Sequence, residues 1–334
     1  MRLHTEKNQY SEEKMEKQCD IIIPVYNSPE WLELCVEAAI RSDISCAIRQ
    51  IILVDDCSDE NTQHTIQSLC AQYKQVISIR NTENLGFIKT CNRGMKLCKS
   101  DAIMLLNSDC LLAVDTTARL LLALEKEPDV GLICPLSNNA ANLSVLIPPQ
   151  ANYVQVDQML SELPNTRYQA CTVVGNCLVI TRECYEAVGG LDEAFGMGYG
   201  EETDYQFRAD AAGFKAVVAG NAYVFHKSQV SFGNSEKLSE QKRKNRELFF
   251  ERWGKEYSLL MKEYVKHDPA KVAASYVTKH SGKLVELNTG LFDQAFLDRV
   301  DRIDRKENAT PQLSAAEKCK ELIKKVVRRI RLIQ

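Results

Sequence analysis

The sequence predicts an α/β protein built on a doubly wound, mainly parallel sheet. Apolar runs that suit buried strands alternate with segments of helical spacing through the first third of the chain. Each apolar run ends in a short polar loop, which is typical of strands whose carboxyl ends carry a binding site. The regular alternation stops after Pro135. We therefore expect a regular first half, a second half with a mixed sheet, and a helical C-terminal extension.

The first predicted strand, residues 19–25, is a continuous apolar run that indicates burial on both faces. Ser28-Pro29 follows it, and offers an N-cap residue and a proline at the first helical position. Apolar residues then recur at helical spacing up to Ile40. A second strand is predicted at residues 50–54, ahead of a further helix.

The third predicted strand covers residues 76–79, and a helix that reaches about Lys99 separates it from a fourth strand at residues 103–106. The carboxyl ends of these strands should lie on one side of the sheet, so the polar residues that follow them should face one crevice. These residues are Asn27, Asp55, Asn84 and Asp109.

The second half has weaker patterns. Residues 137–165 are rich in Asn, Ser and Pro, and a loop of this length in a compact domain is typically functional or disordered. A strand is predicted around residues 175–180. A helix at residues 202–213 begins beside a cluster of carboxylates, and a short strand at residues 216–219 leads to His226.

The C-terminal part is predicted to be helical. Residues 235–267 form a charged helix, and the weaker pattern beyond Asp268 predicts a loosely attached extension. In residues 317–333, an apolar helical stripe is bordered by seven basic residues. Such a helix can lie in a membrane interface, or it can pack against its own domain or a partner subunit. The predicted divisions are a polar leader at 1–18, a main domain at 19–260 and an extension at 261–334.

Composition and charge exclude several classes of protein. The 334 residues carry a formal net charge of −3, which gives no signature of nucleic-acid binding. The leader has no apolar region of a secretory signal, and no stretch approaches the ~20 apolar residues of a membrane span. The 13 cysteines are scattered through apolar stretches without a CxxC pair, which predicts reduced, mostly buried thiols. These features predict a cytoplasmic protein.

The strand ends carry a different chemistry from a Gly-rich phosphate loop. The chain has no GxGxxG after the first strand and no GxxxxGK[ST], so the two common Gly-rich nucleotide motifs are absent. Instead, the fourth strand delivers Asn107-Ser108-Asp109, and a carboxylate there can hold a divalent cation against the phosphates of a ligand. Taken alone, these residues would suit a turn or a helix cap equally well.

Several short motifs follow one another in a specific order. They are residues 19–27, Asp55-Asp56, Asn84-Leu85-Gly86, Asn107-Ser108-Asp109, Gly175-Asn176, Gly190-Leu191-Asp192-Glu193, Gly200-Glu201-Glu202-Thr203-Asp204 and His226. As an ordered set, they make the chain resemble the inverting family 2 glycosyltransferases of the GT-A fold. The resemblance covers roughly residues 19–253, and it is strongest to bacterial enzymes that build surface polysaccharides. It implies a Rossmann-like nucleotide-binding half followed by an acceptor-side half.

The resemblance also implies a role for each matching residue. It places Pro24, Tyr26, Asn27 and Asp55 in the nucleoside pocket, Asn84 and Gly86 beside the nucleotide, and Asn107, Ser108 and Asp109 at the Asp-x-Asp motif of the family. It implies Asp109 and His226 as ligands of Mn²⁺ or Mg²⁺, Glu202 as the catalytic base, and Gly175, Asn176, Glu201 and Asp204 as acceptor-binding groups. Asn107 stands where the family has an aspartate, so one anionic group is missing there.

The resemblance implies transfer of a hexosyl or deoxyhexosyl group from a nucleotide sugar, such as a UDP-sugar, to a glycan or lipid-linked acceptor. Two alternatives stay open. A nucleotidyltransferase would carry a Gly-rich, basic loop after the first strand, where this chain has Pro24-Val25-Tyr26-Asn27. A non-catalytic sugar-binding relative would not need Asp109, Glu202 and His226 together. An oligomer is compatible with the sequence, and a membrane-bound final helix would place the protein at the inner face of the plasma membrane.

Overall fold

The computed structural model describes residues 15–163, 167–170, 172–227, 236–264, 268–284, 286–287 and 289–308. The predicted leader up to residue 14 and the predicted final helix at 317–333 lie outside the described residues. The chain divides into two compact units, Met1–Asp293 and Gln294–Gln334. In the second unit, the described residues form one helix, α11 (Gln294–Asn308).

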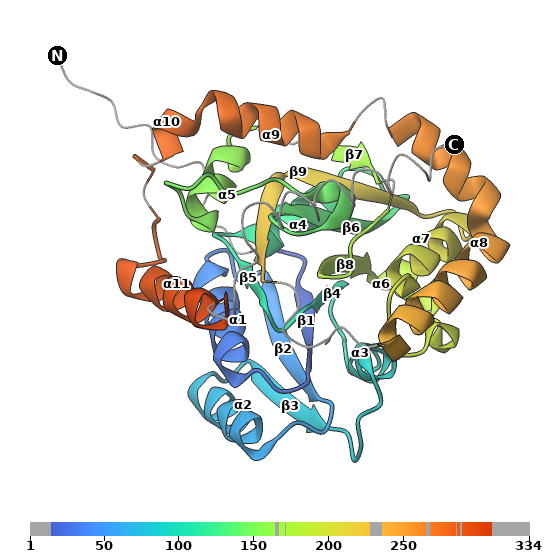
Figure 1. Cartoon of the computed structure of the whole chain (residues 1–334), viewed down its shortest axis with the longest axis horizontal. Helices are drawn as coiled ribbons and strands as arrows, with labels where there is room; N and C mark the ends of the chain where they lie inside the picture. The colour runs from blue at the N-terminus through green and yellow to red at the C-terminus, as the bar shows by residue number, and fades with distance from the viewer. Residues whose placement is uncertain are drawn as a thin grey trace. The chain divides into compact units, whose positions relative to one another are not determined.

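The first half of unit 1 is the predicted alternation of strands and helices (Figure 1). Its elements are β1 (Cys19–Val25), α1 (Pro29–Ser42), β2 (Ile48–Asp55), α2 (Glu60–Gln72), β3 (Val76–Arg80), α3 (Phe87–Met95) and β4 (Ala102–Leu106). The four strands pair in parallel in the order β3-β2-β1-β4. The predicted doubly wound parallel sheet is therefore confirmed.

The second half continues the same sheet with mixed pairing. Its elements are β5 (Cys110–Leu112), α4 (Thr116–Leu124), β6 (Val130–Ser137), η1 (Ala141–Leu143), α5 (Tyr153–Ser161), β7 (Arg167–Gln169), β8 (Cys177–Thr181), α6 (Arg182–Val188), η2 (Glu193–Phe195), α7 (Glu201–Ala211) and β9 (Lys215–His226). The described strands form one sheet in the order β3-β2-β1-β4-β8-β6-β9-β5, with β7 beside β9. β8 runs antiparallel to β4, and β5 runs antiparallel to β9.

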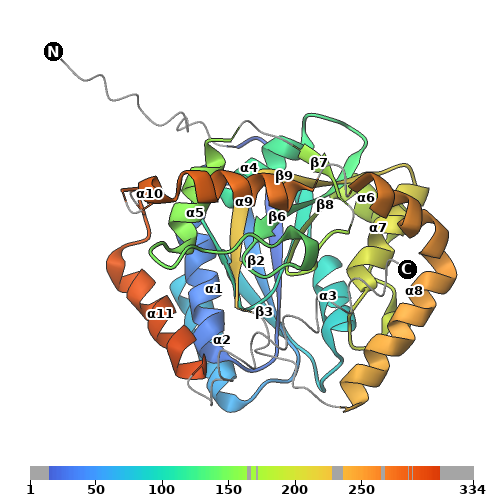
Figure 2. The ribbon, with the colours of Figure 1, turned by 45° about the horizontal axis from the view of Figure 1, so that its top comes forward.

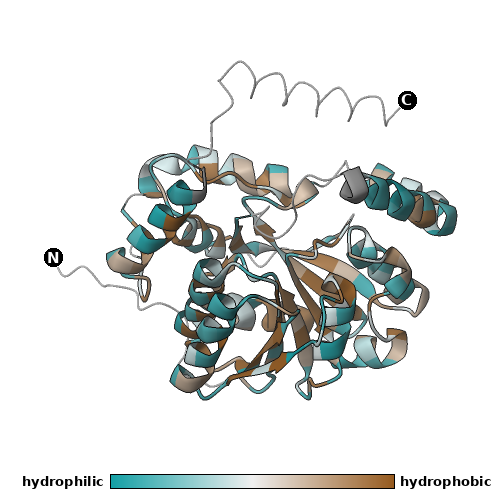
Figure 3. Cartoon of the chain, turned by 60° about the horizontal axis from the view of Figure 1, so that its bottom comes forward, coloured by the Kyte–Doolittle hydropathy of each residue, from teal (hydrophilic) through white to brown (hydrophobic). Residues whose placement is uncertain are grey.

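Strand alternation explains why helices cover both faces of the sheet (Figure 2). Ile21 and Ile23 of β1 belong to the same core as the buried faces of α1 and α2. Ile22 points the other way, toward Gly94 of α3. Gly94 permits this close approach, because a Cβ atom there would lie 2.7 Å from the Ile22 side chain. The hydropathy colouring shows the result, with apolar strands between helices whose outer faces are polar (Figure 3).

Three features differ from the sequence expectation. α5 lies inside the segment expected to be a loop, and it begins with a reciprocal capping box between Asn152 and Gln155. β9 is one strand of 12 residues, whereas a strand was predicted only at residues 216–219. After α8 (Glu236–Tyr264), the chain forms α9 (Pro269–Lys279) and α10 (Ser281–Leu284). α9 packs against α5 and β9 through Ala273 and Val277, so this part of the extension is not loosely attached. Within the described residues, no helix combines the length and the apolar character needed to cross a bilayer.

Candidate active site

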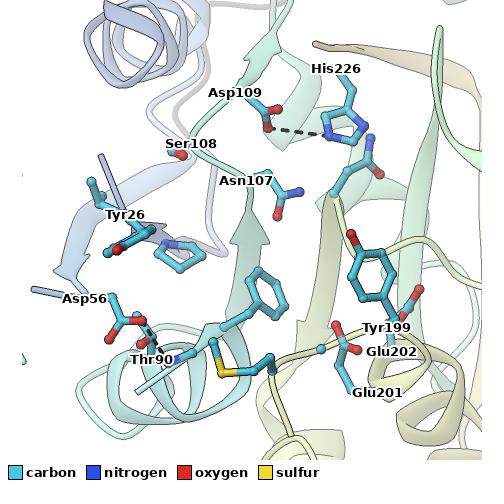
Figure 4. A pocket seen from close by; sticks show the side chains of 18 of the residues that line it. Tyr26, Asp56, Thr90, Asn107, Ser108, Asp109, Tyr199, Glu201, Glu202 and His226 are labelled. Atoms are coloured by element: carbon cyan, nitrogen blue, oxygen red, sulfur yellow. Dashed lines mark hydrogen bonds and ion pairs between the residues drawn. The ribbon is translucent and has the colours of Figure 1, made fainter. Parts of the chain in front are cut away.

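A cavity of about 380 Å³ opens at the carboxyl ends of β1, β2 and β4 (Figure 4). The structure brings most of the predicted site residues into its lining. These residues are Pro24, Tyr26, Asn84, Gly86, Asn107, Ser108, Asp109, Gly175, Asn176, Glu201, Glu202 and His226. Tyr26 and Asp56 stand on one side of the cavity and Tyr199, Glu201 and Glu202 on the other, with Asn107 between them (Figure 4). Asn27, Asp55 and Asp204 are not part of the lining.

The candidate metal site is built by strand pairing. Asp109 lies in the turn between β4 and β5, and His226 ends β9. Cys110 is paired directly with His226 in the β5:β9 ladder, which places the imidazole Nε2 3.5 Å from Asp109 Oδ1. The other ring nitrogen, Nδ1, lies 2.8 Å from the carbonyl oxygen of Asn139. A carbonyl only accepts, so the neutral imidazole carries its proton on Nδ1 and keeps on Nε2 the lone pair that a metal needs.

The surrounding residues fit a divalent ion. The Oδ1 atom of Asn107 is buried in the cavity wall and has no hydrogen-bond partner among the described residues, so a further oxygen is available. Burial alone would lower the pKa of His226, but the hydrogen bond and the charge of Asp109 outweigh it and raise that pKa. The Cys110 thiol also lies within reach. Burial, and then the charge of Asp109, raise the pKa of Cys110 well above its usual range, so this thiol is a poor metal ligand.

Two carboxylates occupy the opposite side of the cavity, in the first turn of α7. Glu202 is half-buried, and its Oε2 atom accepts a hydrogen bond of 3.2 Å from the backbone N–H of Gly200. Gly175 lies beside it, because a Cβ atom at Gly175 would be 3.6 Å from the Glu202 Cβ atom. Burial raises the pKa of Glu202. Burial, and then the neighbouring charge of Glu202, raise the pKa of Glu201 well above its ordinary value. Perturbed carboxylates of this kind are typical of acid–base sites.

Asp56 is a site residue that the sequence analysis did not select. Its Oδ1 atom accepts hydrogen bonds from the backbone N–H of Leu85 and from the side chain of Asn81, both at 2.7 Å. Its Oδ2 atom accepts the N–H of Gly86 at 2.9 Å. Asp56 therefore fixes the loop that carries Asn84 and Gly86. Neighbouring residues at a strand end point to opposite faces, so one member of Asp55-Asp56 had to turn away from the cavity.

Asp55 and Asn27 shape the loops behind the cavity. The Asp55 carboxylate forms an ion pair with Arg80 and accepts the backbone N–H of Ser58 at 2.8 Å. The Oδ1 atom of Asn27 accepts the N–H of Asp59 at 3.0 Å. The contacts of Asp55 join the end of β2 to the end of β3 and to the loop before α2, and the contact of Asn27 joins the loop after β1 to the N-cap residue of α2. The structure thus places these two residues where they hold the loops together, outside the cavity lining.

Asp204 joins α7 to α8 instead of facing the cavity. Its carboxylate is fully buried. One oxygen accepts hydrogen bonds from Arg252 at 3.0 Å and from the indole N–H of Trp253 at 2.9 Å. The other oxygen accepts from Arg208 at 2.9 Å. These contacts orient the first turn of α7, where the two glutamates lie, and Asp204 has no free oxygen for an acceptor sugar.

A second contact from α8 holds the loop before α7. The side-chain amide of Asn245 is buried and donates to the carbonyl oxygens of Phe195, Gly198 and Tyr199 at 2.7–3.0 Å. Tyr199 has a positive φ of 76°, which is uncommon for a residue with a side chain. The Asn245 contact holds this conformation and directs the Tyr199 ring toward the cavity (Figure 4). The spacing between Asn245 and Tyr199 gave no sequence signal for this contact.

Sequence comparison identifies related proteins. A family model described as glycosyl transferase family 2 matches residues 20–189, just over half of the chain. An uncharacterized protein of Mycobacterium tuberculosis is 28% identical over 185 residues, which cover 52% of this chain and 67% of that protein. The chondroitin synthase of Escherichia coli is 29% identical over 119 residues, or 36% of this chain. That match spans only 17% of the chondroitin synthase.

Structure comparison finds the same fold in two solved glycosyltransferase structures. The mannosyltransferase PcManGT of Pyrobaculum calidifontis, solved with GDP-Man and Mn²⁺, has a TM-score of 0.55 and 15% identity, over 80% of this chain and 76% of that one. GalNAc-T7, solved with UDP, GalNAc and Mn²⁺, has a TM-score of 0.55 and 16% identity, over 79% of this chain. The chain spans 55% of GalNAc-T7. At these identities the comparison establishes a shared GT-A fold.

Proposed function

Because the chain belongs to glycosyl transferase family 2, we propose that it transfers a sugar from a nucleoside-diphosphate sugar to a hydroxyl group of a glycan or lipid-linked acceptor, with inversion of the anomeric centre. One observation carries this proposal. A single cavity holds the Asp109–His226 pair and, on another wall, the carboxylate of Glu202. Donor activation and proton removal need these two kinds of group at different sides of one reacting sugar.

The donor side of the cavity suits a nucleotide. The exposed ring of Tyr26 and the backbone of Gly86 offer a flat surface and a close approach for the nucleoside. A divalent ion held by Asp109 and His226 would neutralise the negative charge that develops on the departing diphosphate. Oxygen and imidazole ligands suit Mn²⁺ at least as well as Mg²⁺. The Mn²⁺ and the nucleotides in the solved structures of PcManGT and GalNAc-T7 support this assignment.

The acceptor side supplies the base. The acceptor oxygen forms its bond to the anomeric carbon while the bond from that carbon to the diphosphate oxygen breaks, and the diphosphate leaves with the electron pair. The Glu202 carboxylate takes the proton of the acceptor hydroxyl. A raised pKa makes Glu202 a stronger base once it is ionised. One displacement of this kind inverts the anomeric centre and needs no covalent intermediate.

The proposed setting is surface polysaccharide synthesis at the cytoplasmic side of the membrane. Relatives with similar segments include the poly(ribitol-phosphate) β-glucosyltransferase of Bacillus spizizenii, 29% identical over 90 residues. Seven basic residues in the segment 317–333 would attract anionic lipid, at about 1 kcal/mol each. Co-sedimentation tests this attachment. The full chain should bind anionic vesicles at low salt and a chain truncated at residue 308 should not. Equal sedimentation of the two chains would contradict a membrane role.

Release of nucleoside diphosphate tests the proposed function. The full-length protein would be incubated with UDP-, GDP- and dTDP-sugars, with Mn²⁺, with Mg²⁺ or with EDTA. We expect slow hydrolysis or transfer with one donor class, loss with EDTA, and recovery on addition of the metal. Calorimetry with UDP, GDP and dTDP in the presence of Mn²⁺ provides the control for binding. Failure of all three nucleotides to bind would overturn the proposal, and binding without turnover of any donor would favour the non-catalytic alternative.

A further inference from the structure

A second hollow lies between the first turn of α7 and helix α8, beside the candidate active site. It measures about 210 Å³, and we call it the α7–α8 groove. Tyr199 lines both this groove and the main cavity. Gly200 and Thr203, which flank the two glutamates in the sequence, also line the groove. A molecule bound there would extend toward the side of the cavity where Glu202 stands.

One wall of the groove is aromatic. The rings of Phe249, Phe250 and Tyr257 contact one another edge to face, with centroids 5.5–5.6 Å apart. Phe249 is buried and its ring also contacts that of Phe207 of α7, with centroids 5.7 Å apart, so this part of the cluster packs α8 against α7. Phe250 is 43% exposed and Tyr199 is 37% exposed. The faces of such rings carry partial negative charge, so they attract the polarised C–H groups of a sugar ring.

The same wall carries positive charge. Lys242, Arg246 and Phe250 recur every four residues on α8, so they lie in one row along the helix. The Lys242 ammonium lies 3.9 Å from the centroid of the Tyr199 ring, and the Arg246 guanidinium lies 5.5 Å from that of Phe250. A cation held over a ring keeps N–H groups directed outward for an anion. The described residues that line the groove include these two cations and no carboxylate.

We propose that the α7–α8 groove is an acceptor subsite that selects a glycan with an acidic group, a carboxylate or a phosphate, next to the sugar that is glycosylated. This inference rests on the proposed glycosyltransferase function. Tyr199 and Phe250 contact the sugar ring, while Lys242 and Arg246 form charge-assisted hydrogen bonds to the acid. An acceptor held in this way presents its hydroxyl on the Glu202 side of the cavity.

Binding of paired oligosaccharides tests the subsite. Titration calorimetry of the full-length protein with Mn²⁺ and the nucleotide that binds would compare acidic oligosaccharides, both uronic acids and sugar phosphates, with neutral counterparts of the same length. We expect at least one acidic member to bind about tenfold or more tightly than its neutral counterpart, as one charge-assisted hydrogen bond provides. Uronic acids and sugar phosphates in separate arms distinguish the two sources of charge. Failure of every acidic member to outbind its counterpart, including the absence of any binding, would overturn the proposal.

Two double variants of α8 distinguish the effect of the two groove cations on acceptor binding from the effect of the overall charge of the helix. The double variant Lys242→Gln, Arg246→Gln should lose the preference for acid. The matched control Arg243→Gln, Lys244→Gln removes the same charge from side chains that are about 60% exposed and that pair with Glu240 and Glu247. It should keep the preference. Equal losses in the two double variants would show that the groove does not select the acid.

The ring contact has its own test. Phe250→Leu keeps an apolar side chain and should weaken the binding of acidic and neutral oligosaccharides alike. Unchanged affinity for both would show that the Phe250 ring does not contact the sugar. Nucleotide binding, measured on the same samples, distinguishes failure of the acidic subsite from failure of the proposed function. Nucleotide binding without acid selection refutes the acidic subsite alone. Absence of nucleotide binding to the unmodified protein would refute the proposed function itself.

Discussion

Replacing Asp204 should destabilise the protein, because this carboxylate joins α7 to α8. In Asp204→Ala, Trp253 loses the hydrogen-bond acceptor of its indole N–H, and Arg208 and Arg252 lose an ionic partner. Removal of one partner of a buried ion pair typically costs about 3–5 kcal/mol. The carboxylate is fully buried, but the arginine side chains are 24% and 33% exposed, so water can reach them in the variant. We therefore expect a loss near the lower limit, about 3 kcal/mol.

Urea unfolding measures this loss. The tryptophan signal of the full-length protein would be followed for the unmodified chain, Asp204→Ala and Asp204→Asn, and the shift in midpoint would be read at constant slope. Asp204→Asn keeps one acceptor oxygen and should lose less than Asp204→Ala. The control Asp210→Ala removes an exposed carboxylate from the same helix, and should stay within about 0.5 kcal/mol of the unmodified protein.

The same variants distinguish an anchoring role of Asp204 from the acceptor-binding role that the family resemblance implies for it. An anchor lowers stability and moves the glutamates of α7, so transfer activity and unfolding midpoint should fall together. An acceptor ligand would instead raise the KM for acceptor without moving the unfolding midpoint. If Asp204→Ala unfolds within 1 kcal/mol of the unmodified protein, the anchoring argument fails.

The other predictions concern the cavity. Asp109→Asn should weaken Mn²⁺ binding in the presence of nucleotide at least about tenfold, since a charged metal ligand is lost, and an unchanged Mn²⁺ affinity by electron paramagnetic resonance would contradict the metal site. Glu202→Gln should lower kcat by about 10²–10⁴ with donor affinity unchanged; Glu201→Gln is its comparison, and a larger loss there would make Glu201 the base. Burial raises the pKa of Glu202, and the base acts only when it is ionised. We therefore expect kcat to fall as the pH drops through a pKa above the ordinary ~4.3 of glutamate. The pH–rate profile of Glu202→Gln should lack this acidic limb. Gly86→Ala would place a Cβ atom 2.6 Å from Met197 Sδ at a residue whose φ is +82°, so nucleotide affinity should fall and the free energy of unfolding should drop by about 1–3 kcal/mol. The control Gly189→Ala has the same positive φ but no neighbour within 4 Å, and it should leave nucleotide affinity unchanged.

The parallel half of the fold was predictable because its signals are local. Buried strands such as β1 and β4 are continuous apolar runs, and the polar residues after them must gather at one edge of the sheet. Asp109 was found in this way. His226 was found through the order of the family motifs, and the pairing of β5 with β9 explains why it reaches Asp109.

The rest depends on contacts between distant residues. The role of Asp204 is determined by Arg252 and Trp253, which lie 48 and 49 residues further along the chain. The strand predicted at residues 216–219 was too short because Gly220-Asn221 follows it, and the pairing of β9 with β6 shifts register in this region. β-strands of this kind are held by cross-strand partners more than by their own pattern.

The ladder between β5 and β9 also determines which changes in chain length the protein can tolerate. Successive side chains of a strand point to opposite faces, so one residue inserted just before His226 would turn the imidazole to the far side of the sheet. The connection between β6 and α5 has no such constraint over residues 146–151, because they lie outside the paired strands and before the N-cap of α5, and Leu146 is 78% exposed. Insertions there should leave Asp109 and His226 together. We therefore expect a change in chain length to be tolerated in this connection and to abolish metal binding between Tyr223 and His226.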